Sequence, residues 1–260
     1  MAKGQRESEQ PNKIPVQPID CREALHWFVE TVGLYKGSTR GLLVSNFDEA
    51  NEPYLESAVI NLKSRGITPA VVEGAAIYQQ AARLWDQAVR GTSFGRPVAT
   101  QFELDLTGSP VTVINNFTPP QTAQQLWYLY HHILYPRALA GKPLLITTKH
   151  DYYELVGLGG DCDDLEYAGR KVTWEKVLYI LDATTIDLHH FSQMKEEGLP
   201  PMLKAEYYLY KTLKAREFPI TPMHVVGDYM LDFAIYNRHA KLDVEIDKRL
   251  FAGRKRFIFG

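Results

Sequence analysis

Residues Gly41–Leu55 have the sequence GLLVSNFDEANEPYL, in which a short apolar run is followed by polar, turn-forming residues and then by the start of a helix. The run Gly41–Ser45 predicts a short buried strand, because strands buried on both faces are continuously apolar. The segment Asn46–Pro53 predicts a loop, and Tyr54–Arg65 predicts a helix that ends at Gly66. A strand, a loop and a helix in this order are typical of an α/β fold.

The same alternation of apolar runs and helical patterns continues along the chain. Further strands are expected at Ile67–Glu73, Pro110–Ile114 and Pro143–Thr148. Helices are expected at Cys21–Leu34, at Gly74–Arg90, at Ala123–Ala140, where Pro136 should kink or end the helix, and around Trp174–Ile180. Strands that alternate with helices predict a parallel sheet covered by helices on both faces, so the expected fold class is α/β.

The chain as a whole has the composition of a folded globular protein. It has 260 residues, of which 45% are hydrophobic and 23% charged, and this excludes mostly disordered, collagen-like and coiled-coil proteins. No apolar run approaches the roughly 20 residues of a membrane-spanning helix. The polar segment 1–20 lacks the apolar stretch of a secretory signal. We therefore expect a cytoplasmic protein with a disordered lead and no membrane partner.

The order of elements between residues 20 and 190 resembles the P-loop ATPases, in particular the AAA+ ATPases related to DnaA and to helicase loaders. The resemblance implies that Asn46–Pro53 takes the place of the phosphate-binding loop. It implies that VTVINNF at Val111–Phe117 takes the place of the acidic strand that holds the metal, and that LLITTK at Leu144–Lys149 takes the place of the sensor strand.

Two of these places lack the residues that nucleotide chemistry needs. A phosphate-binding loop needs glycines whose backbone N–H groups converge, followed by Lys and Ser or Thr. The segment SNFDEANEPYL has neither glycine nor lysine, and its carboxylates would repel phosphate. Asn115 and Asn116 stand where a metal-holding carboxylate is expected, and an amide carries no charge for Mg²⁺. We therefore expect a degenerate P-loop-like domain without ATP hydrolysis; a different α/β fold is the alternative.

The pattern changes after the polar stretch Asp187–Pro201, which is interpreted as a domain boundary. Beyond it we expect a helix at Met202–Arg216 and two antiparallel strands at Tyr229–Tyr236 and Lys241–Ile246. The predicted division is a lead at 1–20, a degenerate P-loop-like domain at 21–190 and a small α+β domain at 200–260.

Carboxylates recur on the helix and the strands of this C-terminal part. Asp232 interrupts an apolar strand, and Glu245 lies in the strand that follows. Because side chains alternate along a strand, Asp243, Glu245 and Asp247 share one face, and a hairpin would bring Asp232 near Glu245. Glu206, early in the helix, could add a third carboxylate. Grouped carboxylates repel one another unless a cation neutralises them, and hard oxygen ligands suit Mg²⁺ or Mn²⁺.

The segments around these carboxylates resemble the PD-(D/E)xK nuclease superfamily, in the branch similar to the very-short-patch-repair endonucleases. They are KAEYYL at Lys204–Leu209, YMLDFA at Tyr229–Ala234 and KLDVEID at Lys241–Asp247. The resemblance implies that Asp232 and Glu245 bind the metal and that Glu206 is an auxiliary carboxylate.

The same resemblance places Asp247 where other members of the superfamily carry the catalytic lysine. Lys248 stands where a glycine is expected, and the histidine that usually follows is absent. Lys248 could supply the missing cation, although it should point away from Asp247 if the strand continues. Further basic residues that could steady a phosphate are Arg249, Arg254, Lys255 and Arg256.

These residues predict a metal-dependent DNA endonuclease that cleaves phosphodiester bonds. The candidate catalytic residues are Asp232, Glu245, Asp247, Glu206 and Lys248. One alternative is a catalytically inactive adaptor that docks onto an ATPase or onto a DNA transposition or defence complex. An inactive nuclease-like DNA binder and an ordinary pair of structural strands also remain open.

Aromatic and histidine-rich helical segments are the other candidates. The tyrosines around Trp127 and around Tyr207 fit either stacking on nucleobases or ordinary packing. Neighbouring side chains on a helix diverge by about 100°. The pairs His131–His132 and His189–His190 are therefore not expected to chelate a metal and are assigned to surfaces or interfaces.

Overall fold

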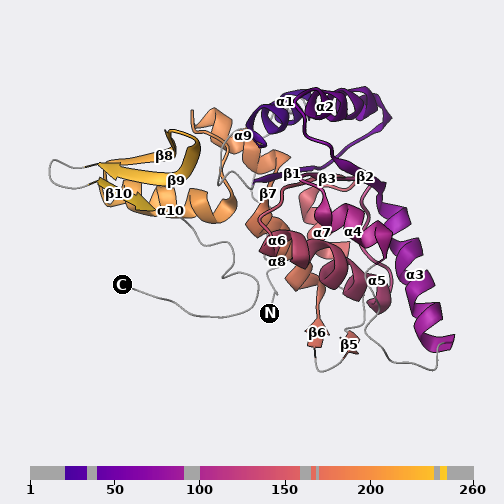
Figure 1. Ribbon diagram of the computed structural model, residues 1–260. Coiled ribbons are helices and arrows are strands. Elements are labelled where there is room, and N and C mark those ends of the chain that lie inside the picture. The colour runs from indigo at the N-terminus through magenta and orange to yellow at the C-terminus, as the bar shows by residue number, and fades with distance from the viewer. Residues whose placement is uncertain are drawn as a thin grey trace, which may run out of the picture.

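A five-stranded parallel sheet forms the centre of the computed structural model (Figure 1). The structure describes residues 21–33, 40–90, 100–158, 165–167, 170–236 and 241–244. The strands of the sheet are β1 (Gly41–Val44), β2 (Ala70–Glu73), β3 (Thr112–Asn115), β4 (Leu144–Thr147) and β7 (Thr185–Asp187). Their order across the sheet is β2-β3-β4-β1-β7. This confirms the expected α/β class, in which helices flank a parallel sheet.

The helices on the two faces of the sheet bury two separate hydrophobic cores. On one face lie α1 (Cys21–Thr31), α2 (Glu52–Ser64) and α9 (Leu188–Glu196), whose apolar residues pack with Leu42 and Val44 of β1. The other face is covered by α3 (Gly74–Arg90), α4 (Gln101–Gly108) and α8 (Trp174–Thr184), among others, and its core includes Leu43 and Ile146. Alternate residues of β1 thus enter opposite cores, which explains its continuously apolar sequence.

Two helical segments differ from the sequence-based expectation. The capping box between Thr100 and Glu103 starts α4, which the sequence analysis did not predict. The long helix expected at Ala123–Ala140 is present but consists of α5 (Ala123–Tyr128), a π-helical segment η2 (Leu129–Leu134) and α6 (Tyr135–Leu139). Pro136 lies in the first turn of α6, where its missing N–H costs least. The helix therefore continues past the proline.

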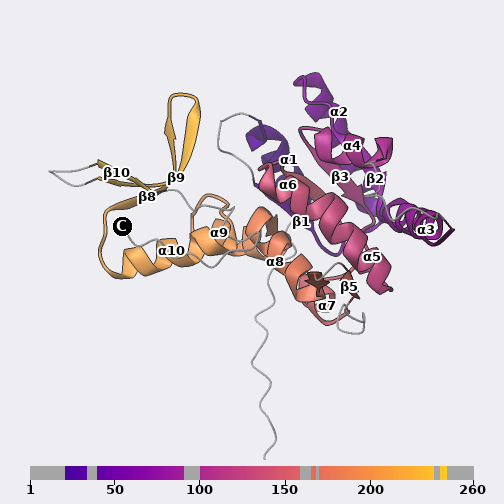
Figure 2. The same ribbon diagram turned by 60° about the horizontal axis from the view of Figure 1, so that its bottom comes forward.

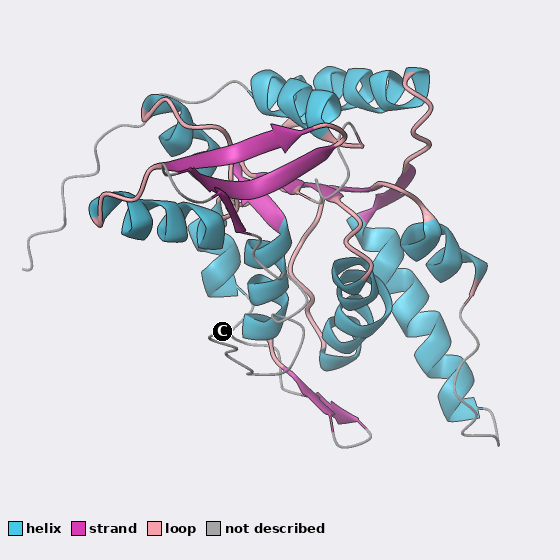
Figure 3. Ribbon diagram, turned by 60° about the vertical axis from the view of Figure 1, so that its left-hand side comes forward, coloured by secondary structure: helices cyan, strands magenta, loops and turns pink. Residues whose placement is uncertain are grey.

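The C-terminal part has the expected helix followed by antiparallel strands. Helix α10 (Lys204–Ala215) precedes β8 (Ile220–Val226), β9 (Tyr229–Tyr236) and β10 (Lys241–Val244), which pair in the order β10-β9-β8. We call α10 and these strands the tail module. Figure 3 brings its strands in front of the parallel sheet. The rest of the chain contains α7 (Tyr152–Leu158), the one-turn helix η1 (Glu49–Asn51) and the small hairpin of β5 (Leu165–Tyr167) and β6 (Arg170–Val172).

The tail module shares a core with the parallel sheet. Leu203, Tyr207, Ile220 and Phe233 of the tail belong to the same buried cluster as α1 and β1. The stretch Asp187–Pro201, interpreted as a boundary, contains α9, and Figure 2 shows α8, α9 and α10 leading from the parallel sheet to the tail strands. The division into separate domains stays a prediction. Among the residues that the structure describes, no helix combines the length and apolar character needed to cross a bilayer.

Candidate functional site

The chain that leaves β1 continues to pair with the chain that leaves β4. The N–H of Phe47 donates to the carbonyl of Thr148 at 2.8 Å, and the N–H of Asn46 donates to that of His150 at 3.2 Å. The N–H of Thr148 donates to the carbonyl of Val44 at 2.9 Å. In open α/β sheets, ligands bind outside the carboxyl ends of such strands. Here backbone hydrogen bonds close the space between β1 and β4.

The side chains that follow β1 also disfavour the binding of an anion such as phosphate. Phe47 is 2% exposed and belongs to the hydrophobic core, so it does not turn outward. Asp48, Glu49 and Glu52 surround the start of α2, the end of a helix where phosphate would need free N–H groups and no negative charge. This geometry agrees with the expectation of no ATP hydrolysis, which stays a prediction.

At the neighbouring strand ends, amide side chains hold a carboxylate that the sequence analysis did not single out. Glu73, the last residue of β2, accepts hydrogen bonds from the Nδ2 atoms of Asn115 at 2.9 Å and Asn116 at 3.2 Å. The hydroxyl of Thr147 donates to Oδ1 of Asn115 at 2.5 Å and accepts from the N–H of Asn116 at 3.0 Å. The edge at β2, β3 and β4 is thus cross-linked by its own side chains. The sequence signal that could have identified Glu73 was its position at the end of the strand expected at Ile67–Glu73.

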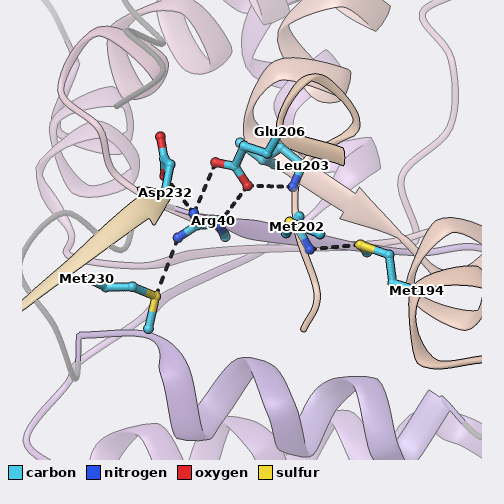
Figure 4. Close-up of polar contacts among 7 residues, drawn as sticks. All are labelled: Arg40, Met194, Met202, Leu203, Glu206, Met230 and Asp232. Atoms are coloured by element: carbon cyan, nitrogen blue, oxygen red, sulfur yellow. Dashed lines mark hydrogen bonds and ion pairs between the residues drawn. The ribbon is translucent and has the colours of Figure 1, made fainter. Parts of the chain in front are cut away.

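Glu206 and Asp232, two of the predicted site residues, converge on the buried guanidinium of Arg40 (Figure 4). Nε and Nη2 of Arg40 donate to the two carboxylate oxygens of Glu206 at 3.0 and 3.1 Å. Nη2 also donates to Oδ1 of Asp232 at 2.6 Å, and Nη1 contacts the sulfur of Met230 at 3.6 Å. We call Arg40, Glu206 and Asp232 the Arg40 clamp.

Three elements of the fold position the residues of the clamp. Arg40 immediately precedes β1, and Glu206 is in the first turn of α10, where its carboxylate also accepts the N–H of Leu203 at 2.8 Å. Asp232 is an inward residue of β9, and the side chains of all three residues are no more than 2% exposed. Bonds from a guanidinium to two carboxylates are charge-assisted and geometrically specific. The clamp therefore fixes the tail module against the start of β1.

The structure thus brings together two of the predicted metal-site residues, with a guanidinium as their counter-cation. The described residues contain no group of three or more His, Cys, Asp or Glu side chains arranged to hold a metal ion. Glu245, Asp247 and Lys248 lie outside the described residues, so the assignment of Asp232 and Glu245 as metal ligands stays a prediction. Arg40 was missed because its partners are distant in sequence, and its only local signal is a basic residue before a buried strand.

One member of each histidine pair is in contact with buried groups of the protein. Nδ1 of His132 contacts Oε1 of the buried Glu103 at 3.0 Å. His190 is 5% exposed and packs edge-to-face on Tyr207, with ring centroids 5.0 Å apart. Burial lowers the pKa of both His132 and His190, because a charged imidazole is poorly solvated there. The assignment to a surface was wrong for His190.

Comparisons with known proteins give no family assignment. No family model matches the chain, and no curated protein matches its sequence significantly. Among solved structures, the DnaC helicase loader matches with a TM-score of 0.37 and 16% identity, over 70% of this chain and 85% of that chain. A replication initiator DnaA bound to AMPPCP and single-stranded DNA matches with a TM-score of 0.37 and 11% identity, over 75% of this chain and 58% of that chain. No functional conclusion follows from likenesses at this TM-score.

Proposed function

We propose that the chain is a non-hydrolysing, AAA+-like scaffold that acts by docking onto partner macromolecules. The partners in view are an ATPase or a DNA transposition or defence complex. One observation carries the proposal: the space outside β1 and β4, where a nucleotide would bind, is closed by backbone pairing and by the buried Phe47. Because this edge is closed and acidic, we assign the parallel sheet a supporting role and not a nucleotide-binding one.

Nucleotide binding and hydrolysis by the full-length chain test this proposal. A fluorescent ATP analogue with Mg²⁺ should show no saturable binding up to millimolar concentrations, and phosphate release should equal that of buffer. An active AAA+ ATPase in the same assays provides the positive control. Saturable binding that unlabelled ATP displaces would contradict the proposal, as would phosphate release above background.

A metal-dependent DNA endonuclease is the second candidate, favoured by the convergence of Glu206 and Asp232 at one buried point. In this function Asp232 and Glu245 bind Mg²⁺ or Mn²⁺, and Glu206 helps to place the metal or the attacking water. A metal ion held by these residues would supply electrostatic stabilisation of the charge that develops on a phosphodiester. By the resemblance, Asp247 stands where the superfamily has its catalytic lysine, and Lys248, which stands where a glycine is expected, would steady the phosphate.

Cleavage of supercoiled, linear and single-stranded DNA with Mg²⁺, Mn²⁺ or EDTA separates the two candidates. The endonuclease requires metal-dependent cutting that is lost in Asp232→Asn and Glu245→Gln. Asp86→Asn, a change at an exposed carboxylate of α3, is the matched control. A folded wild-type protein that cuts no substrate under any of these conditions would exclude the second candidate and leave the scaffold.

A further inference from the structure

A cavity of about 610 Å³ lies between α7, α8, α9 and α10, at the carboxyl end of β7. Its volume is within the range of about 300–1,000 Å³ that is usual for ligand sites. Asp187, the last residue of β7, is part of its wall. Crevices outside the carboxyl ends of strands are where open α/β sheets bind ligands. Unlike the space at β1, this one is open.

The floor of the cavity already binds one cation of the chain itself. Nζ of Lys204 lies 3.5 Å from the centroid of the Tyr152 ring, and it contacts Asp182 at 2.8 Å and Asp187 at 3.3 Å. Burial alone lowers the pKa of Lys204, but Asp187, Asp182 and Tyr152 raise it above its ordinary value, so the ammonium stays charged. Two carboxylates against one ammonium leave the floor with a net negative charge.

The tyrosines of the cavity differ in what they can offer a ligand. The hydroxyl of Tyr152 donates to Asp182 at 2.6 Å, and burial raises the pKa of this phenol to about 12, so it stays neutral. A face of the Tyr152 ring is already occupied by the ammonium of Lys204. At the rim, Tyr153 is 69% exposed and Tyr208 is 67% exposed. Both rings are accessible to an incoming group.

A buried polar atom in the wall has an unmet hydrogen-bonding capacity. His190 lines the cavity, and its Nε2 is buried with no well-aligned hydrogen-bond partner in the part of the chain that the structure describes. Buried polar groups in native proteins are normally paired, so each exception calls for a physical explanation, of which a bound group is one. The cavity therefore combines aromatic faces, negative charge and an unpaired polar atom.

We propose that this cavity binds a cationic side chain, preferably the flat guanidinium of an arginine, from a basic peptide segment of a partner protein. Charge complementarity selects this occupant, because the negative floor repels the phosphodiester backbone of a nucleic acid. A guanidinium stacks on a tyrosine ring and donates to carboxylates in one plane, as neither a neutral base nor a compact ammonium does. The inference rests on the proposed scaffold function and names the chemistry of its partner.

Binding of two short fluorescent peptides to the full chain tests the inference. One has an Arg-Arg pair flanked by glycine and serine, and the other has citrulline at both positions, which keeps the shape and removes the charge. We expect saturable binding of the arginine peptide and at least about tenfold weaker binding of the citrulline peptide, since cation–π contacts contribute about 0.5–2 kcal/mol each. Equal binding of both peptides would overturn the inference.

Variants at the cavity locate the binding. Tyr153→Ala with Tyr208→Ala removes two exposed rings, and Asp182→Asn removes a charge of the floor. Each should weaken binding of the arginine peptide about tenfold. Tyr229→Ala, at a tyrosine of β9 that is 55% exposed, is the matched control and should bind like wild type. Thermal unfolding verifies that each variant is folded.

Two results would overturn the cationic site. One is unchanged peptide binding in both cavity variants; the other is an oligothymidylate that binds wild type and is lost only in the tyrosine variant, which would assign the cavity to nucleobases. The ATP assays are independent of these outcomes. If the chain binds both the arginine peptide and ATP, the proposed scaffold function is refuted and the cationic site is not. If the chain binds neither, only the cationic site is refuted.

Discussion

The carboxyl edge of the sheet differs between β1 and β7, although both strands are short, parallel and adjacent. At β1, the backbone pairs onward with the end of β4, and Phe47 fills the space from within the core. At β7, the chain turns directly into α9, where Asp187 caps the helix by accepting the N–H of His190 at 3.0 Å. An aromatic cavity stays open beside it. The same fold position is thus closed at one strand and open at the next.

This difference indicates where function can lie on a sheet that lacks a phosphate-binding loop. Glycines let backbone N–H groups curl around a phosphate, whereas the residues after β1 extend and pair. A closed space at one strand end does not require the neighbouring strand ends to be closed, because each strand end is followed by its own connecting segment. The start of β1 is also linked to the cavity, since Arg40 precedes β1 and donates to Glu206 of α10, a helix that lines the cavity at β7.

The largest expected effect comes from removing the contact between Arg40 and Glu206. Arg40→Met leaves Glu206 and Asp232 buried without their cation, which should lower the free energy of unfolding by about 3–5 kcal/mol. Urea unfolding monitored by circular dichroism measures it. A triple variant with Glu206→Gln and Asp232→Asn should regain part of the loss, because it also removes the two buried carboxylate charges that the guanidinium neutralised. A change of less than about 1 kcal/mol in Arg40→Met would contradict this view of the clamp.

Adding Mn²⁺ to the same unfolding experiment tests whether the two carboxylates can bind a metal ion. In Arg40→Met, the two carboxylates lack the guanidinium, so a metal ion could replace it. If Mn²⁺ raises the unfolding midpoint of this variant and not of the triple variant, the carboxylates form a metal site and the endonuclease gains support. If Mn²⁺ has no effect on either, the clamp is a purely structural ion pair.

Phe47→Ala tests the closed edge. Removing a core phenylalanine should cost about 3 kcal/mol through lost burial and a residual cavity. ATP should still not bind, because Asp48, Glu49 and Glu52 remain. Phe218→Ala, at a phenylalanine that is 43% exposed, is the control and should cost much less. A gain of nucleotide binding in Phe47→Ala would show that Phe47 alone blocks an otherwise intact site.

Asn115→Asp introduces a carboxylate at the position where the sequence analysis expected a metal-holding one. The change removes the donor to Glu73 and places a second negative charge beside it, which should cost about 2 kcal/mol. We expect no phosphate release from ATP. Asn61→Asp, on the exposed face of α2, should leave stability nearly unchanged. ATPase activity in Asn115→Asp would mean that the edge at β1 can accept a nucleotide after all.

The smallest expected effect is a pH dependence at the open edge. Because burial lowers the pKa of His190, the unfolded state binds a proton that the folded state resists. Stability should therefore fall as the pH drops from about 6.5 through the lower pKa of the folded state. Unfolding midpoints between pH 8 and pH 5 should fall less steeply in His190→Gln, while the exposed-site control His26→Gln should follow wild type. Equal slopes in all three proteins would refute this expectation.

The sequence predicted the elements with strong local signals. Helix α3 and strand β9 have the expected bounds, because a long amphipathic pattern and an apolar run before turn residues leave little ambiguity. Strand β7 was missed since it has only three residues and directly joins two helices, so its identity depends on pairing with β1. Helix α4 was missed although its Thr100–Glu103 capping box is visible in the sequence.

The candidate site was predicted in its residue types but not in its partners. The sequence analysis expected Glu206 to add a carboxylate to the group around Asp232, and in the structure both residues bind Arg40. Their contact with Arg40 spans 166 and 192 positions along the chain, and no local pattern reports a contact of that separation. The cavity at β7 likewise arises from four helices, and the tyrosines that α7, α8 and α10 contribute to it are also consistent with ordinary packing.

Hydrogen–deuterium exchange of the full chain, with and without saturating Mg-ATP, tests the central claim most directly. The amides of Asn46, Phe47 and Thr148 are hydrogen-bonded across the end of β1 and β4. We expect slow exchange in this segment that Mg-ATP leaves unchanged. A change in exchange on adding Mg-ATP, confined to residues 45–52 and 147–150, would show that a nucleotide binds there and that the edge at β1 is not closed.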